Sequence, residues 1–221
     1  MKYRHFFINK GIISAVFALC ISNVSYALSN DPLGKHFLQK AVGDLSNCGP
    51  ISALMARQYS QKNYKVVNLA SSIRDARGQS HQDSSDDMFF SESTQGRWWK
   101  MSDIKSYFNK HNVAYKPLLV SNNPREIVNA LRNNQIVLIN LNMNDIPRGT
   151  RSIGKPYFTF PVPGGWGHYL MIIGFDYIDG ELVFEAHDSF RRAGKNRLFY
   201  AKNIMRAVKR YYPETLLVKK H

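Results

Sequence analysis

Residues 167–190 have the sequence GHYLMIIGFDYIDGELVFEAHDSF, and most of the architecture follows from them. Two largely apolar segments, 168–177 and 181–188, flank a short polar break. Between them, Ile178-Asp179-Gly180 favours a tight turn, because its glycine tolerates the left-handed conformation. The stretch therefore predicts an antiparallel hairpin with a three-residue loop.

The register of this hairpin decides which side chains meet. A three-residue loop pairs Tyr177 with Glu181 and, by counting along both strands, places Leu170 opposite Asp188. His168 and Asp188 then become diagonal neighbours on one face, within reach of each other. A two-residue loop would put them on opposite faces, so the inference depends on the register.

Strand alternation separates Asp188 from its neighbour His187. Asp188 shares a face with the apolar residues Phe184 and Ala186, where a carboxylate needs a partner. His187 lies on the other face with Glu185, and we expect that face to point to solvent.

A third candidate residue, Cys48, opens a predicted helix. Apolar residues recur downstream at helical spacing: Ile51, Leu54, Met55 and Tyr59. Pro50 suits a first helical turn, and a helix N-terminus stabilises a thiolate. An inert core cysteine is the alternative, but the flanking Asn47, Gly49 and Pro50 favour a reactive thiol.

The remaining pattern gives the class of fold. We expect helices at 66–74, 102–110 (with Ser102 as N-cap), 124–133 and 202–210, and further strands at 114–120, 136–141, 197–200 and 215–218. Helices come first and an antiparallel sheet follows, without strand–helix–strand alternation. This order predicts an α+β fold.

Cys48, His168 and Asp188 together form a nucleophile, a base and an orienting carboxylate. In this interpretation Cys48 attacks a carbonyl carbon, and His168 pairs with the thiolate and protonates the leaving group. Asp188 holds the imidazole. A purely structural histidine is the alternative for His168, although the glycines before it leave room for a substrate backbone.

Three motifs in this order resemble those of the papain-like cysteine peptidases of the bacteriocin-processing, double-glycine-leader type, in a stand-alone form. They are Asn-Cys-Gly-Pro at 47–50, Gly-His with an apolar strand at 167–176, and His-Asp-Ser-Phe at 187–190. The resemblance spans about residues 36–218. It implies a papain-like fold, with the nucleophile at a helix start packed on an antiparallel sheet, and a peptide or protein substrate.

The same resemblance implies a glutamine before the nucleophile that donates a hydrogen bond to the oxyanion. Gln39 is the nearest upstream glutamine, nine residues before Cys48, and position 42, where the family pattern would place it, is valine. Gln39 is therefore the candidate donor. Asn47 and the Cys48 backbone N–H are the alternatives, and Gln39 is otherwise a surface helix residue.

The first 27 residues have the pattern of a secretory signal peptide. Basic residues Lys2, Arg4 and Lys10 precede an apolar core at 11–24, and Ser25-Tyr26-Ala27 follows as a cleavage site. Residues 28–221 then form one domain, secreted or periplasmic, with Cys48 as its only cysteine. An uncleaved anchor and a lipid on Cys20 are the alternatives.

Composition limits the other possibilities. With 44% hydrophobic and 13% aromatic residues, the chain is too apolar for a disordered protein. The net charge of +14, or +11 after removal of the signal peptide, suits an anionic surface such as a cell-envelope polymer. No nucleic-acid motif accompanies it, so no nucleic-acid partner is expected. No stretch is long and apolar enough for an ordinary transmembrane helix.

Two weaker signals remain. The acidic run Asp83, Asp86 and Asp87 is interpreted as a solvated loop rather than a cation site, and no metal or organic cofactor is expected. The aromatic pairs Phe89-Phe90 and Trp98-Trp99 either line a cleft or pack in the core.

Taken together, the signal peptide and the Cys48, His168 and Asp188 constellation predict an exported thiol hydrolase, most directly a cysteine peptidase. A thiol acyltransferase or amidase and a catalytically silent binding module are the alternatives.

Overall fold

The computed structural model describes residues 46–78, 98–146, 167–190 and 194–221. Gln39, the acidic run, Phe89-Phe90 and the signal-peptide segment lie outside these ranges. The described helices are α1 (Cys48–Ser60), α2 (Leu69–Arg77), α3 (Met101–Lys110), α4 (Arg125–Arg132) and α5 (Ala201–Tyr211), with a short 3₁₀ turn η2 (Met143–Asp145). The strands are β1 (Tyr115–Leu119), β2 (Gln135–Asn142), β3 (Gly167–Ile178), β4 (Glu181–Asp188), β5 (Arg197–Tyr200) and β6 (Glu214–Lys219).

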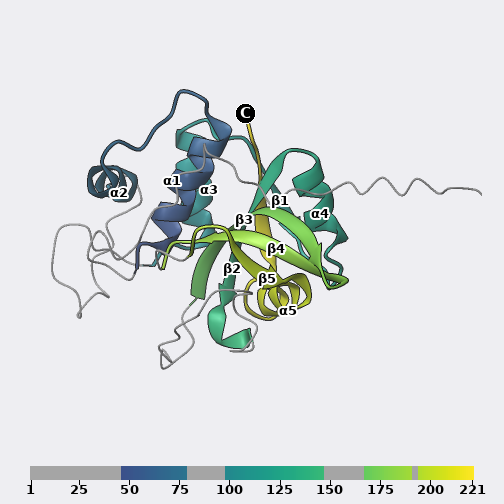
Figure 1. Ribbon diagram of the computed structural model, residues 1–221. Helices are drawn as coiled ribbons and strands as arrows, with labels where there is room; N and C mark the ends of the chain where they lie inside the picture. The colour runs from purple at the N-terminus through teal and green to yellow at the C-terminus, as the bar shows by residue number, and fades with distance from the viewer. Residues whose placement is uncertain (1–45, 79–97, 147–166, 191–193) are drawn as a thin grey trace, which may run out of the picture.

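One antiparallel sheet organises the described residues, in the order β1-β6-β2-β3-β4-β5. Helices α1 and α3 cover one face, with α2 packed against α1, and α4 and α5 cover the other face (Figure 1). The expected α+β class is confirmed, and every expected helix and strand is present. Within the described ranges, no helix has the length and apolar character needed to cross a membrane.

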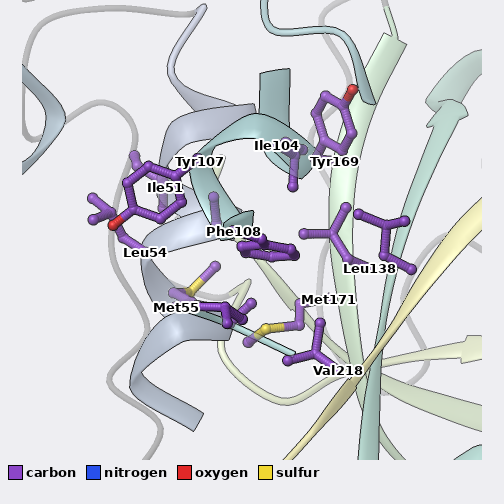
Figure 2. Packing of buried hydrophobic residues seen from close by; sticks show 14 of the residues in the cluster. Ile51, Leu54, Met55, Ile104, Tyr107, Phe108, Leu138, Tyr169, Met171 and Val218 are labelled. Carbon is purple, nitrogen blue, oxygen red and sulfur yellow. The ribbon is translucent and has the colours of Figure 1, made fainter. Parts of the chain in front are cut away.

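The core lies in two layers, one on each side of the sheet. Between the sheet and helices α1 and α3, Leu54, Phe108 and Met171 interlock with little or no exposure to solvent (Figure 2). The helical spacing of Ile51 and Met55 therefore does mark the buried face of α1. Because both faces of the sheet are covered, its central strands are apolar on both sides.

The start of helix α3 differs from the expectation. The helix begins at Met101, and the backbone N–H of Lys100 donates to Asp103 Oδ2 at 2.6 Å. Asp103 thus caps the first turn from inside the helix, where a negative charge is favourable. The assignment of Ser102 as N-cap is wrong by two residues.

The turn of the β3–β4 hairpin also differs from the expectation. Ile178 pairs with Glu181, so the loop has two residues, Asp179 and Gly180, with φ of 51° and 77°. Positive φ at both positions is typical of the two-residue turn that Asp-Gly favours. The predicted three-residue loop is therefore wrong.

A β-bulge on β3 restores the expected pairing of the two strands farther from the turn. The register shifts between Ile172, which pairs with Ala186, and Gly174, which pairs with Glu185. One extra residue, Ile173, moves every earlier side chain of β3 to the opposite face. Leu170 consequently faces Asp188, as expected, although the turn alone would not have produced this pairing.

Candidate active site

Cys48 is the first residue of α1 and is fully buried at the end of the helix nearest β3. Its neighbour Gly49 packs against the chain near Trp99: a Cβ added there would lie 2.7 Å from Trp99 Cβ and 3.4 Å from Tyr169 Cε2. Only glycine allows this close approach without displacing Trp99. The glycine therefore fixes the helix start, and the sulfur with it, against the sheet.

His168 lies at the start of β3 and is 8% exposed, which places it at the edge of the buried layer. Its Nε2 is 2.8 Å from Asp188 Oδ1, and the Cys48 side chain lies close enough to help raise the pKa of the ring. Because Nε2 is occupied by the carboxylate, Nδ1 is the ring nitrogen left for the sulfur. Cys48, His168 and Asp188 are thus brought together from α1, β3 and β4.

The pKa of His168 reflects these neighbours. Burial alone lowers the pKa of an imidazole, because it penalises the charged form. The charge of Asp188, its hydrogen bond and the Cys48 side chain outweigh burial and raise the pKa of His168 to about 10. The imidazolium is therefore the form that this site stabilises, as a thiolate partner requires.

Asp188 is fully buried and well supplied with donors. Besides His168, the backbone N–H of Phe190 donates to Oδ1 at 2.9 Å, and Arg197 Nη1 donates to Oδ2. Burial raises the pKa of this carboxyl group, but His168, Arg197 and the Phe190 N–H together hold it well below its usual range. Asp188 is consequently ionised at any ordinary pH.

Arg197 was not among the residues singled out from the sequence. It is fully buried, and it pairs with Ala186 across β4 and β5, on the same face as Phe199. Alternation along this short strand puts the arginine on the same face as a buried phenylalanine, which predicts that the arginine is buried as well. A buried cation needs an anionic partner, so the pattern also predicts an ion pair.

Arg197 changes the charge balance of the site. With Asp188 ionised, the thiolate–imidazolium form of Cys48 and His168 gives the four groups a net charge of zero. Without Arg197, this form and the thiol–imidazole form alike would leave one net negative charge in a buried environment, which is costly. Arg197 thus neutralises the buried carboxylate in both protonation states of Cys48 and His168, and the preference for the imidazolium comes from Asp188 and Cys48 beside His168.

Gly194 packs closely against the backbone of Asp188. A Cβ at this position would overlap the backbone oxygen of Asp188 and lie 3.1 Å from its Cβ. The chain after β4 therefore turns back closely over Asp188, which only glycine permits.

Asn47 precedes the nucleophile and is fully buried. Arg77, from the end of α2, donates to Asn47 Oδ1 through Nε at 3.0 Å and Nη2 at 2.7 Å. Among the described residues, the Asn47 amide nitrogen Nδ2 has no hydrogen-bond partner. Asn47 therefore presents a fixed, unused donor next to Cys48, whereas Gln39 lies outside the described residues.

His187 does not point to solvent, and that expectation is wrong. It is 1% exposed, its Nε2 is 3.0 Å from Tyr59 Oη, and the Asn196 N–H donates to its Nδ1 at 3.3 Å. The alternation itself is correct, since His187 and Asp188 face opposite sides. The face of His187 is buried because α1 covers it, which strand alternation alone does not reveal.

The described residues contain no group of three or more His, Cys, Asp or Glu side chains that could hold a metal ion.

The Trp98-Trp99 pair both packs in the core and lines a cavity, the two alternatives expected from the sequence. Trp99 is 3% exposed and belongs to the core, and both tryptophans also line a cavity beside the site.

Comparison with known proteins places the fold. No family model matches the sequence, and no curated protein matches it. Among solved structures, it is similar to a Bacillus anthracis crystal structure that carries the provisional description of a C39-like peptidase. The two are 15% identical with a TM-score of 0.56, and the match covers 89% of this chain and 98% of that one.

The chain has the fold of a C39-like, papain-like peptidase. The resemblance seen in the sequence is thereby confirmed at the level of the fold. At 15% identity the likeness carries no residue roles.

Proposed function

We propose that this protein is a thiol hydrolase, most directly a cysteine peptidase, with Cys48 as nucleophile. The observation that carries the proposal is the chain of contacts from Cys48 to His168 and from His168 to Asp188. A thiol hydrogen-bonded to an imidazole that is oriented by a carboxylate is the arrangement that activates a cysteine. The similarity of the fold to a C39-like peptidase supports peptides as the substrate class.

The reaction proceeds through an acyl-enzyme. The Cys48 thiolate attacks the carbonyl carbon of the scissile bond, and a negative charge develops on the carbonyl oxygen. His168 then gives its proton to the leaving amine as the C–N bond breaks, leaving a thioester on Sγ. Water, deprotonated by His168, attacks the thioester, and the acid product leaves as Sγ regains its negative charge.

The oxyanion needs donors close to Cys48. The backbone N–H of Cys48 is one candidate, because the first N–H groups of a helix have no partner within the helix. Asn47 Nδ2 is the second, since Arg77 holds the other end of the same amide and leaves this nitrogen without a partner. Gln39 remains a third candidate, implied by the resemblance alone.

The test is cleavage of a diverse peptide library by the wild-type protein and by Cys48→Ala. The proposal expects products from the wild type and none from the variant, with unchanged circular dichroism. Added amine acceptors distinguish hydrolysis from acyl transfer: aminolysis products in place of acids would identify a transferase. A wild-type protein that cleaves no peptide and forms no covalent adduct with peptide electrophiles would instead identify a silent binding module.

We also propose that the protein is exported after cleavage behind Ala27. The basic start, apolar core and small residues of positions 1–27 support this. Sequencing of the mature N-terminus tests it, with residue 28 expected as the first residue. A mature chain that retains Met1 would contradict cleavage, and a lipid-modified Cys20 would point to a lipoprotein.

A further inference from the structure

An aromatic cavity of about 610 Å³ adjoins the proposed catalytic residues. Its aromatic lining comes from three separate parts of the chain: Trp98 and Trp99, Tyr169, and Tyr211 and Tyr212. A volume of this size accommodates a large side chain or a small ligand. Tyr211 and Tyr212 are 42% and 37% exposed, so their rings are open to a guest.

Cys48 and His168 do not line the cavity themselves, but residues next to each of them contact or form its wall. Gly167 and Tyr169, which flank His168, line it. Trp99 and Tyr169 also line it, and both pack on Gly49, the neighbour of Cys48. Since an extended peptide advances about 3.3 Å per residue, a chain with its carbonyl at Cys48 reaches the cavity within one or two residues.

Two polar atoms in the lining lack partners. Trp99 Nε1 is a buried donor and Asn140 Oδ1 is a buried acceptor, and neither has a hydrogen-bond partner in the part of the chain that the structure describes. The wall itself is rigid, because Tyr169 Oη donates to the Trp99 backbone oxygen at 3.0 Å. A hydroxyl group is both donor and acceptor, and so matches this pair of atoms.

The charge of the lining favours a neutral or anionic guest. Lys100 and Lys105 line the cavity, and no carboxylate does so among the described residues. Lys105 is bound to Glu214 at 2.7 Å, which leaves Lys100 as the cationic group beside the aromatic rings. A lysine or arginine side chain in the cavity would therefore find no carboxylate in this lining to pair with.

We propose that this cavity is a specificity site for a tyrosine side chain of the substrate, within two residues of the cleaved bond. The aromatic walls stack on the ring, and Trp99 Nε1 and Asn140 Oδ1 bind the hydroxyl group. The inference rests on the proposed peptidase function and adds a substrate preference to it.

Kinetics on matched peptides test the preference. Peptides that differ only in Tyr, Phe, Ala or Lys at the positions flanking the bond should rank in that order in kcat/KM at one of those positions. One net hydrogen bond predicts roughly fivefold for Tyr over Phe, and ring stacking predicts roughly tenfold for Phe over Ala. Equal rates for Tyr and Ala at every position would overturn the proposal.

Variants assign the preference to the cavity. Tyr212→Ala should reduce kcat/KM for the Tyr peptide about fivefold without changing that for the Ala peptide, and Tyr212→Phe should restore it. Asn140→Ala should reduce the advantage of Tyr over Phe, because only the bond to Trp99 Nε1 remains. Tyr177→Ala is the matched control, since Tyr177 is 56% exposed at the far end of β3. An equal loss on both peptides, or a loss in the control, would refute the assignment.

A binding experiment tests the tyrosine site independently of the proposed peptidase activity. Quenching of tryptophan fluorescence in full-length Cys48→Ala is titrated with N-acetyl-tyrosinamide and with N-acetyl-alaninamide. Saturable binding of the tyrosine compound alone, lost in the additional Tyr212→Ala variant, supports the site even if no peptide is ever cleaved. Cleavage of peptides without any such discrimination would leave the peptidase standing and refute the site.

Discussion

Removal of Arg197 tests the charge arrangement of the site. Arg197 and Asp188 are both fully buried, and Arg197 Nη1 donates to Asp188 Oδ2. Deleting one partner of a buried ion pair typically costs about 3–5 kcal/mol, because the other charge remains buried. His168 still faces Asp188, so we expect Arg197→Met to lower the free energy of unfolding by about 3 kcal/mol, the lower end of this range.

The assay is urea unfolding followed by tryptophan fluorescence. Lys202→Met is the matched control, because Lys202 forms an ion pair of 2.7 Å with Glu181 in which the side chains are 63% and 49% exposed. Such exposed pairs contribute at most about 1 kcal/mol. The double variant Arg197→Met/Asp188→Asn should be less destabilised than the sum of the two single variants, by about 1 kcal/mol or more.

Two results would refute this reasoning. An Arg197→Met variant as stable as the Lys202→Met control would mean that Asp188 does not depend on the arginine. Strictly additive effects in the double variant would mean that the two residues act independently, and that the charge balance proposed for the site is absent.

Three further predictions concern neighbouring residues. Asp188→Asn should lower kcat on a cleaved peptide on the order of 10²-fold. His187→Gln should instead lower the unfolding free energy by about 1–3 kcal/mol through lost buried hydrogen bonds and leave kcat within a few-fold. A large loss of kcat in the His187 variant and none in the Asp188 variant would contradict these assignments. The stability of the wild type relative to His168→Gln should be greatest below about pH 6.5 and fall as pH rises toward 10, because the folded state raises the pKa of His168 to about 10; a difference independent of pH in urea unfolding would contradict this. Gly194→Ala should destabilise the fold and lower kcat together, because a Cβ there overlaps the Asp188 backbone; unchanged kinetics would show that Asp188 tolerates the shift.

Periodicity predicted most of the fold. Apolar residues at helical spacing marked the buried face of α1, and alternation in β4 separated Asp188 from His187. These signals are local, and each depends only on residues a few positions apart. They identified Cys48 as the start of α1 and put Asp188 and His187 on opposite faces, whereas the position of His168 relative to Asp188 depends on the register of the hairpin.

The errors arose where the structure depends on distant residues. Gly174, inside the strand, is a weak signal of a bulge but does not fix the register, and the correct pairing of Leu170 with Asp188 came from an incorrect turn that the bulge offsets. The burial of His187 requires α1 to cover that face. Arg197 was overlooked because its partner lies nine residues away on another strand, although an arginine alternating with a buried phenylalanine does indicate one.

The central claim is that Cys48 is a nucleophile activated by His168. It is tested most directly by the rate of alkylation of Cys48 by iodoacetamide at pH 6, measured by peptide mass mapping of the wild type, of His168→Ala and of the urea-unfolded chain. The account predicts that native Cys48 reacts at least tenfold faster than in either comparison, because the imidazolium stabilises the thiolate. A native rate equal to or below that of the unfolded chain, unaffected by His168→Ala, would identify Cys48 as an inert core thiol and contradict the account.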